Sequence, residues 1–223
     1  GGIFGQQKVT VLKVGDRKSN DISFSVSTPK LEIIKQGYDE NGKLKRLKGV
    51  TISIYQNGNF VKSGVTDDNG HIDFGNLPAG KYTAKETSTP KGYVLDTQEQ
   101  TFEVKASIGS SDNIVLNFKN SRYPNISINK KGYDENGNLV NLKGVEISIF
   151  DKNNSKIASG LTDESGNINF GPLEDRVKVG ETYTARETKT INGYILDSTP
   201  QTFTINKTTS SKQDIHLSFV DKR

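Results

Sequence analysis

The sequence predicts an all-β protein that contains two β-sandwich modules in tandem. Short alternating runs of Val, Ile, Tyr and Phe are separated by turns rich in Gly and Asn, a pattern typical of sandwich strands. The segments GYDENG, LKGV and ISI also occur twice at matched spacing, in the stretches that begin at Leu31 and Asn125. Repetition with a period of roughly 95 to 100 residues indicates a duplicated structural unit.

The first 30 residues are expected to be the terminal strands of a truncated preceding repeat. Two alternating runs, KVTVLKV and DISFSVS, flank the turn GDRKSN and predict a β-hairpin. QKVTV at Gln7 also resembles QTFEV at Gln100 and QTFTI at Gln201, which lie near the end of each module. The expected domains are therefore 1–30, 31–121 and 122–223. Because an isolated hairpin is marginally stable in water, we expect this one to dock on its neighbour.

Composition argues against several classes of function. The net charge is +4, with 30 basic and 26 acidic residues scattered along the chain, and no basic stripe interleaved with aromatic residues predicts nucleic-acid binding. No apolar run predicts membrane insertion within this fragment. The chain lacks cysteine, so disulfide bonds cannot reinforce the fold.

The sequence also predicts neither a cofactor nor a metal, and no turnover enzyme. Its acidic turns, such as DENG at Asp39 and DDNG at Asp67, lack the ligand set of a calcium loop and are ordinary turn chemistry. His71 and His216 have no evident metal or triad partner and are interpreted as structural or surface residues. Neither a phosphate-binding glycine loop nor a nucleophile elbow is present.

Charged residues occupy positions where the period-2 pattern of three strands expects an inward apolar side chain. On the first strand of each module, a lysine comes next on the same face after two aliphatic residues. In the YTAKET and YTARET strands, a glutamate takes the corresponding place after Tyr and Ala, and on the last strand an Asn or Asp takes it after Phe. These residues are Lys35, Glu86 and Asn120 in the first module and Lys130, Glu187 and Asp221 in the second. Each module is thus expected to bury a polar triad.

Two interpretations of this triad remain open on the residues alone. One is a buried ion pair with a hydrogen-bonded Asn or Asp, which performs no chemistry. In the other, the lysine amine attacks the side-chain carbonyl of the Asn or Asp and forms an intramolecular isopeptide bond. Burial lowers the pKa of a lysine and raises that of a glutamate, which would supply a neutral nucleophile beside a protonated acid.

A family resemblance favours the second interpretation. The succession KxGYDENG, GVxISIY, TDDNGHIDFGNLPAGKYTAKETSTPKGYVLD and a final FKN resembles the Cna B-type (SpaA-like) repeats of Gram-positive surface proteins and pilins. The resemblance covers residues 31–223 and implies immunoglobulin-like (prealbumin-like) sandwiches. It also implies two isopeptide bonds: Lys35 to Asn120 assisted by Glu86, and Lys130 to Asp221 assisted by Glu187. The matching position in the leading piece is Thr28, which cannot be an acceptor.

We therefore expect the stalk of an adhesin or pilus-type protein, extracellular and anchored to the cell wall of a Gram-positive bacterium. The expected partners are neighbouring repeats of the same chain, and the fragment is expected to be a monomer. Two alternatives remain: a pilus backbone subunit, and a binding module for a host extracellular-matrix protein. For the binding module, Phe60, Tyr93 and Tyr194 are the candidate aromatic anchors, although each could equally belong to the core.

Overall fold

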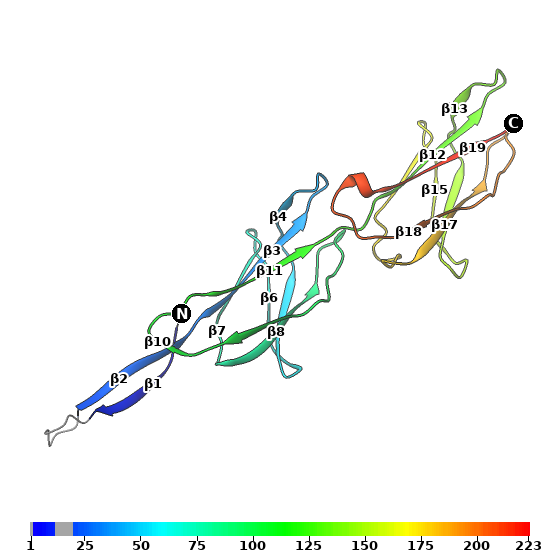
Figure 1. The fold of residues 1–223 in the computed structure, drawn as a ribbon. Helices are drawn as coiled ribbons and strands as arrows, with labels where there is room; N and C mark the ends of the chain where they lie inside the picture. The colour runs from blue at the N-terminus through cyan, green and yellow to red at the C-terminus, as the bar shows by residue number, and fades with distance from the viewer. Residues whose placement is uncertain (1, 12–19) are drawn as a thin grey trace. The chain divides into compact units, whose positions relative to one another are not determined.

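The computed structural model describes residues 2–11 and 20–223, which form two compact units. One unit carries strands β1 to β11 and the other carries β12 to β19 (Figure 1). The described residues contain a single helix, the 3₁₀ turn η1 (Ser211–Gln213). Within the same residues, no helix has the length and apolar content needed to cross a membrane.

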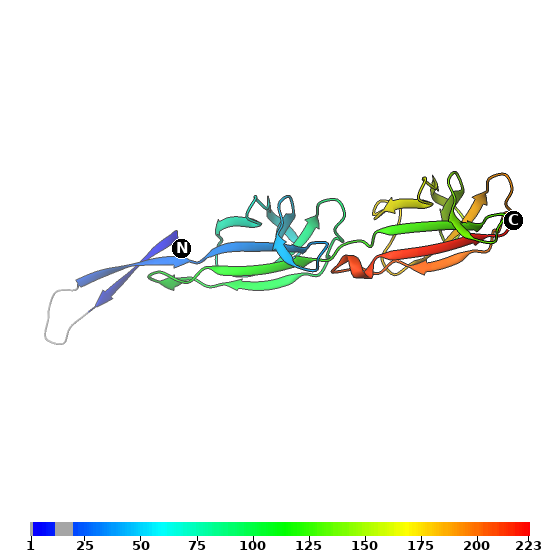
Figure 2. The ribbon, with the colours of Figure 1, turned by 90° about the horizontal axis from the view of Figure 1, so that it is seen from above.

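The first unit contains a β-sandwich of two four-stranded sheets. Its strands are β3 (Lys30–Tyr38), β4 (Leu44–Arg46), β5 (Thr51–Gln56), β6 (Asn59–Val65), β7 (His71–Asn76), β8 (Gly80–Ser88), β9 (Gln100–Val104) and β11 (Ile114–Asn120), while the short β10 (Ser107–Ile108) belongs to a separate sheet. In one sheet β3 lies beside β11, β4 and β7, and the other sheet has the order β6-β5-β8-β9. The first and last strands, β3 and β11, pair in parallel and lie side by side in both views (Figures 1 and 2).

The second unit repeats this topology. Its strands are β12 (Ile126–Tyr133), β13 (Leu139–Asn141), β14 (Glu146–Phe150), β15 (Lys156–Leu161), β16 (Asn167–Gly171), β17 (Thr182–Lys189), β18 (Gln201–Thr204) and β19 (Ile215–Asp221). One sheet joins β12 to β13, β16 and β19, and the other has the order β15-β14-β17-β18. The first and last strands again pair in parallel. The all-β prediction and the tandem sandwiches are confirmed.

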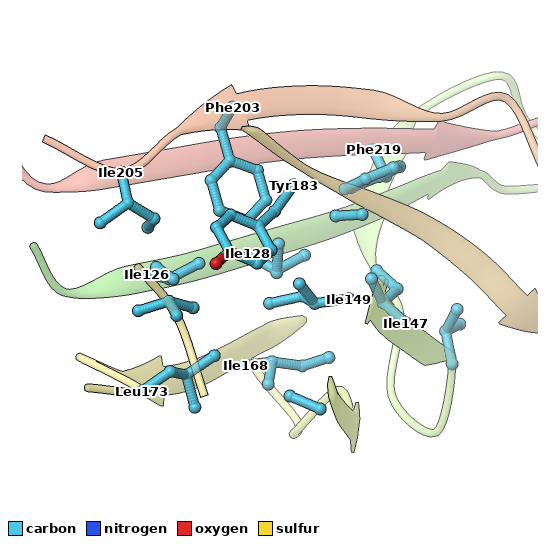
Figure 3. Close-up of a cluster of buried hydrophobic side chains, with 14 of the residues drawn as sticks. Ile126, Ile128, Ile147, Ile149, Ile168, Leu173, Tyr183, Phe203, Ile205 and Phe219 are labelled. Carbon is cyan, nitrogen blue, oxygen red and sulfur yellow. The ribbon is translucent and has the colours of Figure 1, made fainter. Parts of the chain in front are cut away.

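Alternating side chains from both sheets fill the interior of each sandwich. In the second unit, Ile128 and Phe219 come from one sheet and Ile149 and Tyr183 from the other, and all four are buried (Figure 3). Burying one large aliphatic or aromatic side chain contributes about 1.5–3 kcal/mol, so this alternation is the main force that holds the sheets together. The same pattern in the first unit buries Leu31, Ile33, Ile52, Ile54, Tyr82 and Phe118.

Acidic turns connect successive strands, and each is held by the side chain of its aspartate. Oδ1 of Asp39 accepts hydrogen bonds from the backbone N–H groups of Asn41 and Lys43, both at 2.9 Å. The carboxylates of the equivalent turns at Asp67, Asp134, Asp151 and Asp163 bind the backbone in the same way. These carboxylates therefore act as local caps that fix the turn geometry.

The leading segment forms an antiparallel pair of strands, β1 (Gly2–Val11) and β2 (Asn20–Thr28). The turn expected between them falls largely outside the described residues. Ser27 and Val26 of β2 also pair with Ser107 and Ile108 of β10, so the hairpin gains a third strand from the loop between β9 and β11 of the first unit. That this hairpin is the end of a further repeat remains a prediction.

Candidate functional site

The interior of each sandwich contains a lysine at the position that the alternation predicts. Along β3, residues Leu31, Ile33 and Lys35 all have 0% of their surface exposed. Lys130 of β12 is 1% exposed and follows the buried Ile126 and Ile128. Since lysine is almost never fully buried without a partner, each ammonium requires a polar environment inside the core.

A tight turn fixes the backbone at each lysine. The N–H of Lys35 donates to the carbonyl of Gly70 at 2.7 Å, and its carbonyl accepts from Leu47 N at 3.0 Å. Gly70 has φ of +65°, and a Cβ added there would lie 2.4 Å from the Lys35 carbonyl oxygen. Only glycine therefore fits this turn. Gly166 stands in the same relation to Lys130, with a φ of +75° and the same 2.4 Å approach.

The acceptor comes from the neighbouring parallel strand. In the register of β3 with β11, Phe118 lies opposite Lys35 and Asn120 lies opposite Gly37. Asn120 is 1% exposed, and its Oδ1 accepts a hydrogen bond from Lys35 Nζ. The lysine also donates to the carbonyl of Gln36 at 3.1 Å. The first and last strands are thus joined through their side chains as well as their backbones.

The glutamate reaches this pair from the opposite sheet. Glu86 of β8 is 2% exposed, and its Oε1 lies 3.4 Å from Lys35 Nζ. Its Oε2 accepts hydrogen bonds from Asn120 Nδ2 and from the backbone N–H of Asp96, both at 2.8 Å. One carboxylate oxygen therefore faces the amine, and the other faces the amide nitrogen of the acceptor.

The second unit assembles the same cluster around an aspartate. Lys130 Nζ lies 2.5 Å from Asp221 Oδ1 and 3.7 Å from Glu187 Oε1. Glu187 Oε2 accepts a hydrogen bond from the backbone N–H of Asp197 at 3.0 Å. All three side chains are at most 1% exposed. The structure thus brings the six residues singled out from the sequence together in two buried triads.

Burial sets the electrostatics of both triads. In the first unit, burial lowers the pKa of Lys35, and the nearby Glu86 carboxylate opposes this shift. In the second unit, burial and a hydrogen bond with Asp221 raise the pKa of Glu187 to about 7, while Asp197 N–H and Lys130 oppose the shift. Glu187 therefore holds its proton to a higher pH than an exposed glutamate would.

The candidate aromatic anchors and the two histidines do not belong to the triads. Phe60 is 62% exposed, whereas Tyr93 is buried and Tyr194 packs partly against the core of the second unit. His71 pairs with Glu32 at 2.9 Å, and Nδ1 of His216 lies 2.5 Å from Ser127 Oγ. Over the described ranges, no cluster of three or more His, Asp or Glu side chains could hold a metal ion.

Comparison with known families explains the duplication. The sequence model of the SpaA family, described as a prealbumin-like fold domain, matches residues 29–120 and again residues 124–217. The chain belongs to the SpaA family. Its two SpaA domains correspond to the two repeats, and the predicted family resemblance is confirmed.

The relatives of these SpaA domains include staphylococcal proteins. Serine-aspartate repeat-containing protein F of Staphylococcus epidermidis is 25% identical over 194 residues, which cover 76% of this chain and 11% of the relative. Serine-aspartate repeat-containing protein D of Staphylococcus aureus strain Newman is 28% identical over 158 residues, covering 63% of this chain and 12% of the relative. The chain thus spans about a tenth of the length of these relatives.

Solved structures share the fold of the SpaA domains. A mutant of the shaft pilin spaA from Lactobacillus rhamnosus GG matches with a TM-score of 0.51 and 16% identity, over 88% of this chain and 99% of the pilin. At this level of identity, the likeness concerns the fold alone.

Each SpaA domain also has a threonine at the triad that the sequence reasoning missed. Thr89 Oγ1 accepts a hydrogen bond from Asn120 Nδ2 at 3.0 Å, and Thr190 Oγ1 donates to Asp221 Oδ2 at 2.8 Å. In the sequence, the only sign of these residues is the shared spacing ETxT, which places a threonine three residues after Glu86 and Glu187. Because threonine is common in strands and turns, this spacing alone does not predict a contact with the triad.

Proposed function

We propose that the chain is a stalk segment of a Gram-positive cell-surface adhesin or pilus-type protein. We further propose that each domain cross-links itself once through an intramolecular isopeptide bond. The observation that carries the cross-link is the burial of Lys35 against Asn120 with Glu86 beside both, repeated at Lys130. Membership of the SpaA family, the staphylococcal relatives and the shaft-pilin fold support the structural role.

In the first domain, the proposed reaction releases ammonia. The neutral amine of Lys35 attacks Cγ of Asn120, so that the Nζ–Cγ bond forms while the Cγ–Nδ2 bond breaks. Oε1 of Glu86 faces Nζ and would take a lysine proton, whereas Oε2 accepts from Nδ2 and would return that proton to the leaving nitrogen. Lysine and asparagine side chains thereby become one secondary amide and one ammonia molecule, with Glu86 unchanged.

In the second domain, the proposed reaction releases water. Lys130 Nζ attacks Cγ of Asp221, and one carboxyl oxygen leaves with two protons. An oxygen leaving group needs a proton, and the raised pKa of Glu187 keeps one available on this carboxyl near neutral pH. The chemistry is a single intramolecular event in each domain, which requires no cofactor.

The position of the proposed bonds suits a stalk. Each would join the first strand of a sandwich to the last, so a pulling force that enters at one strand and leaves at the other would pass through a covalent bond. Fixed proximity inside the core would supply most of the acceleration. Consistent with this role, we propose an extracellular, wall-anchored protein whose partners are neighbouring repeats of the same chain.

Intact-mass measurement of the denatured chain tests the proposal. We expect a deficit of one ammonia and one water relative to the sequence. Glu86→Gln should abolish only the ammonia loss, and Glu187→Gln, its matched counterpart, only the water loss. An unmodified mass for the wild-type chain would contradict the cross-link in both domains and would mean that each triad is only a buried ion pair.

A further inference from the structure

We propose that Thr89 and Thr190 are positioning residues that hold the acceptor side chain for attack by the lysine. This inference rests on the proposed cross-linking reaction and concerns what makes that reaction efficient. Thr89 immediately follows β8 and Thr190 immediately follows β17, so both hydroxyls enter the triad from the same place in the fold. Their contacts with the acceptors are the observation that carries the inference.

The torsion that must be controlled is the terminal one of the acceptor. Rotation about the bond between Cβ and Cγ of Asn or Asp is soft, because this torsion joins an sp³ and an sp² carbon. A lysine nitrogen must approach the flat face of the carbonyl carbon, so free rotation would move that face out of reach. Holding the plane of the acceptor therefore raises the fraction of molecules poised for attack.

In the first domain, hydrogen bonds fix this plane at both ends of the carboxamide. Asn120 Nδ2 donates to Glu86 Oε2 at 2.8 Å and to Thr89 Oγ1 at 3.0 Å, while Oδ1 faces Lys35 Nζ. Both N–H groups of the amide are thus engaged. Without the Thr89 hydroxyl, the leaving nitrogen would keep its contact with Glu86 but would lose the second hydrogen bond that restrains the plane of the amide.

In the second domain, the hydroxyl reverses its role. Thr190 Oγ1 donates to Asp221 Oδ2 at 2.8 Å, and the other oxygen, Oδ1, faces Lys130. A hydroxyl can both donate and accept, so one residue type can orient either a carboxamide or a carboxyl group. This property explains how the same position can serve an Asn acceptor in one domain and an Asp acceptor in the other.

The test uses the full chain made by cell-free synthesis. Samples are denatured at intervals, and mass spectrometry follows the loss of ammonia from the first domain and of water from the second over time. Thr89→Val removes the hydroxyl at nearly constant volume and is expected to slow ammonia loss by at least about tenfold. Water loss from the second domain should keep its wild-type rate in the same molecules. Thr190→Val should give the reverse result.

Two further variants separate positioning from packing. Thr89→Ser restores the hydroxyl without the methyl group and is expected to recover a rate close to that of the wild type. Thr87→Val changes a threonine two residues earlier, whose hydroxyl lies 3.1 Å from Ser53 Oγ away from the triad, and should leave both rates unchanged. Backbone NMR spectra establish whether each variant folds.

Wild-type rates in Thr89→Val, or equally slow rates in Thr89→Ser, would overturn the positioning role. Loss of the native spectrum of the first domain in Thr89→Val would assign the residue a structural role and would also overturn it. Absence of both mass losses from the wild-type chain would instead contradict the cross-linking reaction itself, so the two failures are distinguishable.

Discussion

Lys35 and Asn120 are 85 residues apart in the sequence, yet Lys35 Nζ donates a hydrogen bond to Asn120 Oδ1 in the interior of one sandwich. The parallel pairing of β3 with β11 makes this contact possible, because it places the first and last strands of the domain side by side. Two interpretations of the triad that Lys35 and Asn120 form with Glu86, a buried ion pair and a precursor of a covalent bond, differ in their consequences for mass and stability.

The identity of the acceptor in the second domain offers a sharp chemical test. Asn and Asp acceptors give the same amide after reaction, since one loses ammonia and the other loses water. The variant Asp221→Asn is therefore expected to have the same mature mass as the wild-type chain. If neither protein reacts at this site, the intact masses will instead differ by the ordinary difference between Asp and Asn.

Replacing the buried lysine and glutamate together by apolar residues should show whether the triad stabilises the domain through a covalent bond. The double variant Lys35→Met with Glu86→Leu removes both members of the pair and leaves no charge unpaired in the core. With a cross-link, we expect the free energy of unfolding of the first domain to fall by about 4–5 kcal/mol, since the bond closes a long loop in the unfolded chain.

The buried ion pair predicts the opposite sign. Replacing such a pair by a well-packed apolar side chain is often neutral or stabilising, by about 1–4 kcal/mol. Denaturation of the double variant and wild-type chains in guanidinium chloride distinguishes the two interpretations. A variant at least as stable as the wild type would contradict the cross-link in this domain.

The second domain should form its bond more slowly relative to the first at alkaline pH. The pKa of Glu187 is raised to about 7, above its ordinary value of 4.5, so its proton is bound below that pH and lost above it. Both reactions need a neutral lysine, but only the departing oxygen of Asp221 needs the proton of Glu187, so the ratio of water loss to ammonia loss should fall as the pH rises through about 7.

Time courses of water loss from freshly synthesised chain between mildly acidic and alkaline pH measure this dependence. Ammonia loss from the first domain, followed in the same samples, is the reference rate. A ratio of water loss to ammonia loss that stays constant or rises across neutral pH would show that the proton of Glu187 has no part in the reaction.

Gly70 and Gly166, whose carbonyls accept hydrogen bonds from the backbone N–H groups of Lys35 and Lys130, are expected to tolerate no other residue. Gly70→Ala would place a Cβ 2.4 Å from the Lys35 carbonyl oxygen, at a φ of +65°. Gly58→Ala is the matched control, because its φ is +77° but no atom lies within 4 Å of the added Cβ. The control should lose only the cost of a left-handed residue, about 1–2 kcal/mol.

Thermal and chemical unfolding of the two variants compares these effects. Gly70→Ala should be clearly less stable than Gly58→Ala, since the turn must also move away from the strand that carries Lys35. Equal stabilities would mean that the turn yields easily and does not fix the lysine backbone.

The sequence predicts the triads because a strand alternates with a period of two, and a charged residue at an inward position stands out against its apolar neighbours. Lys35, Glu86 and Asn120 stand out in this way. The parallel register that puts Asn120 beside Lys35 depends on the pairing of distant strands, which alternation does not encode. Likewise, the contact of Thr89 depends on the path of the chain after β8.

Tandem mass spectrometry of a tryptic digest tests the central claim most directly. If Lys35 is bonded to Asn120, trypsin cannot cleave after Lys35, and a branched product should join residues 31–43 to residues 120–122. The second bond should join residues 123–131 to residues 213–222. Recovery of only linear peptides, with cleavage after Lys35 and Lys130, would contradict the account.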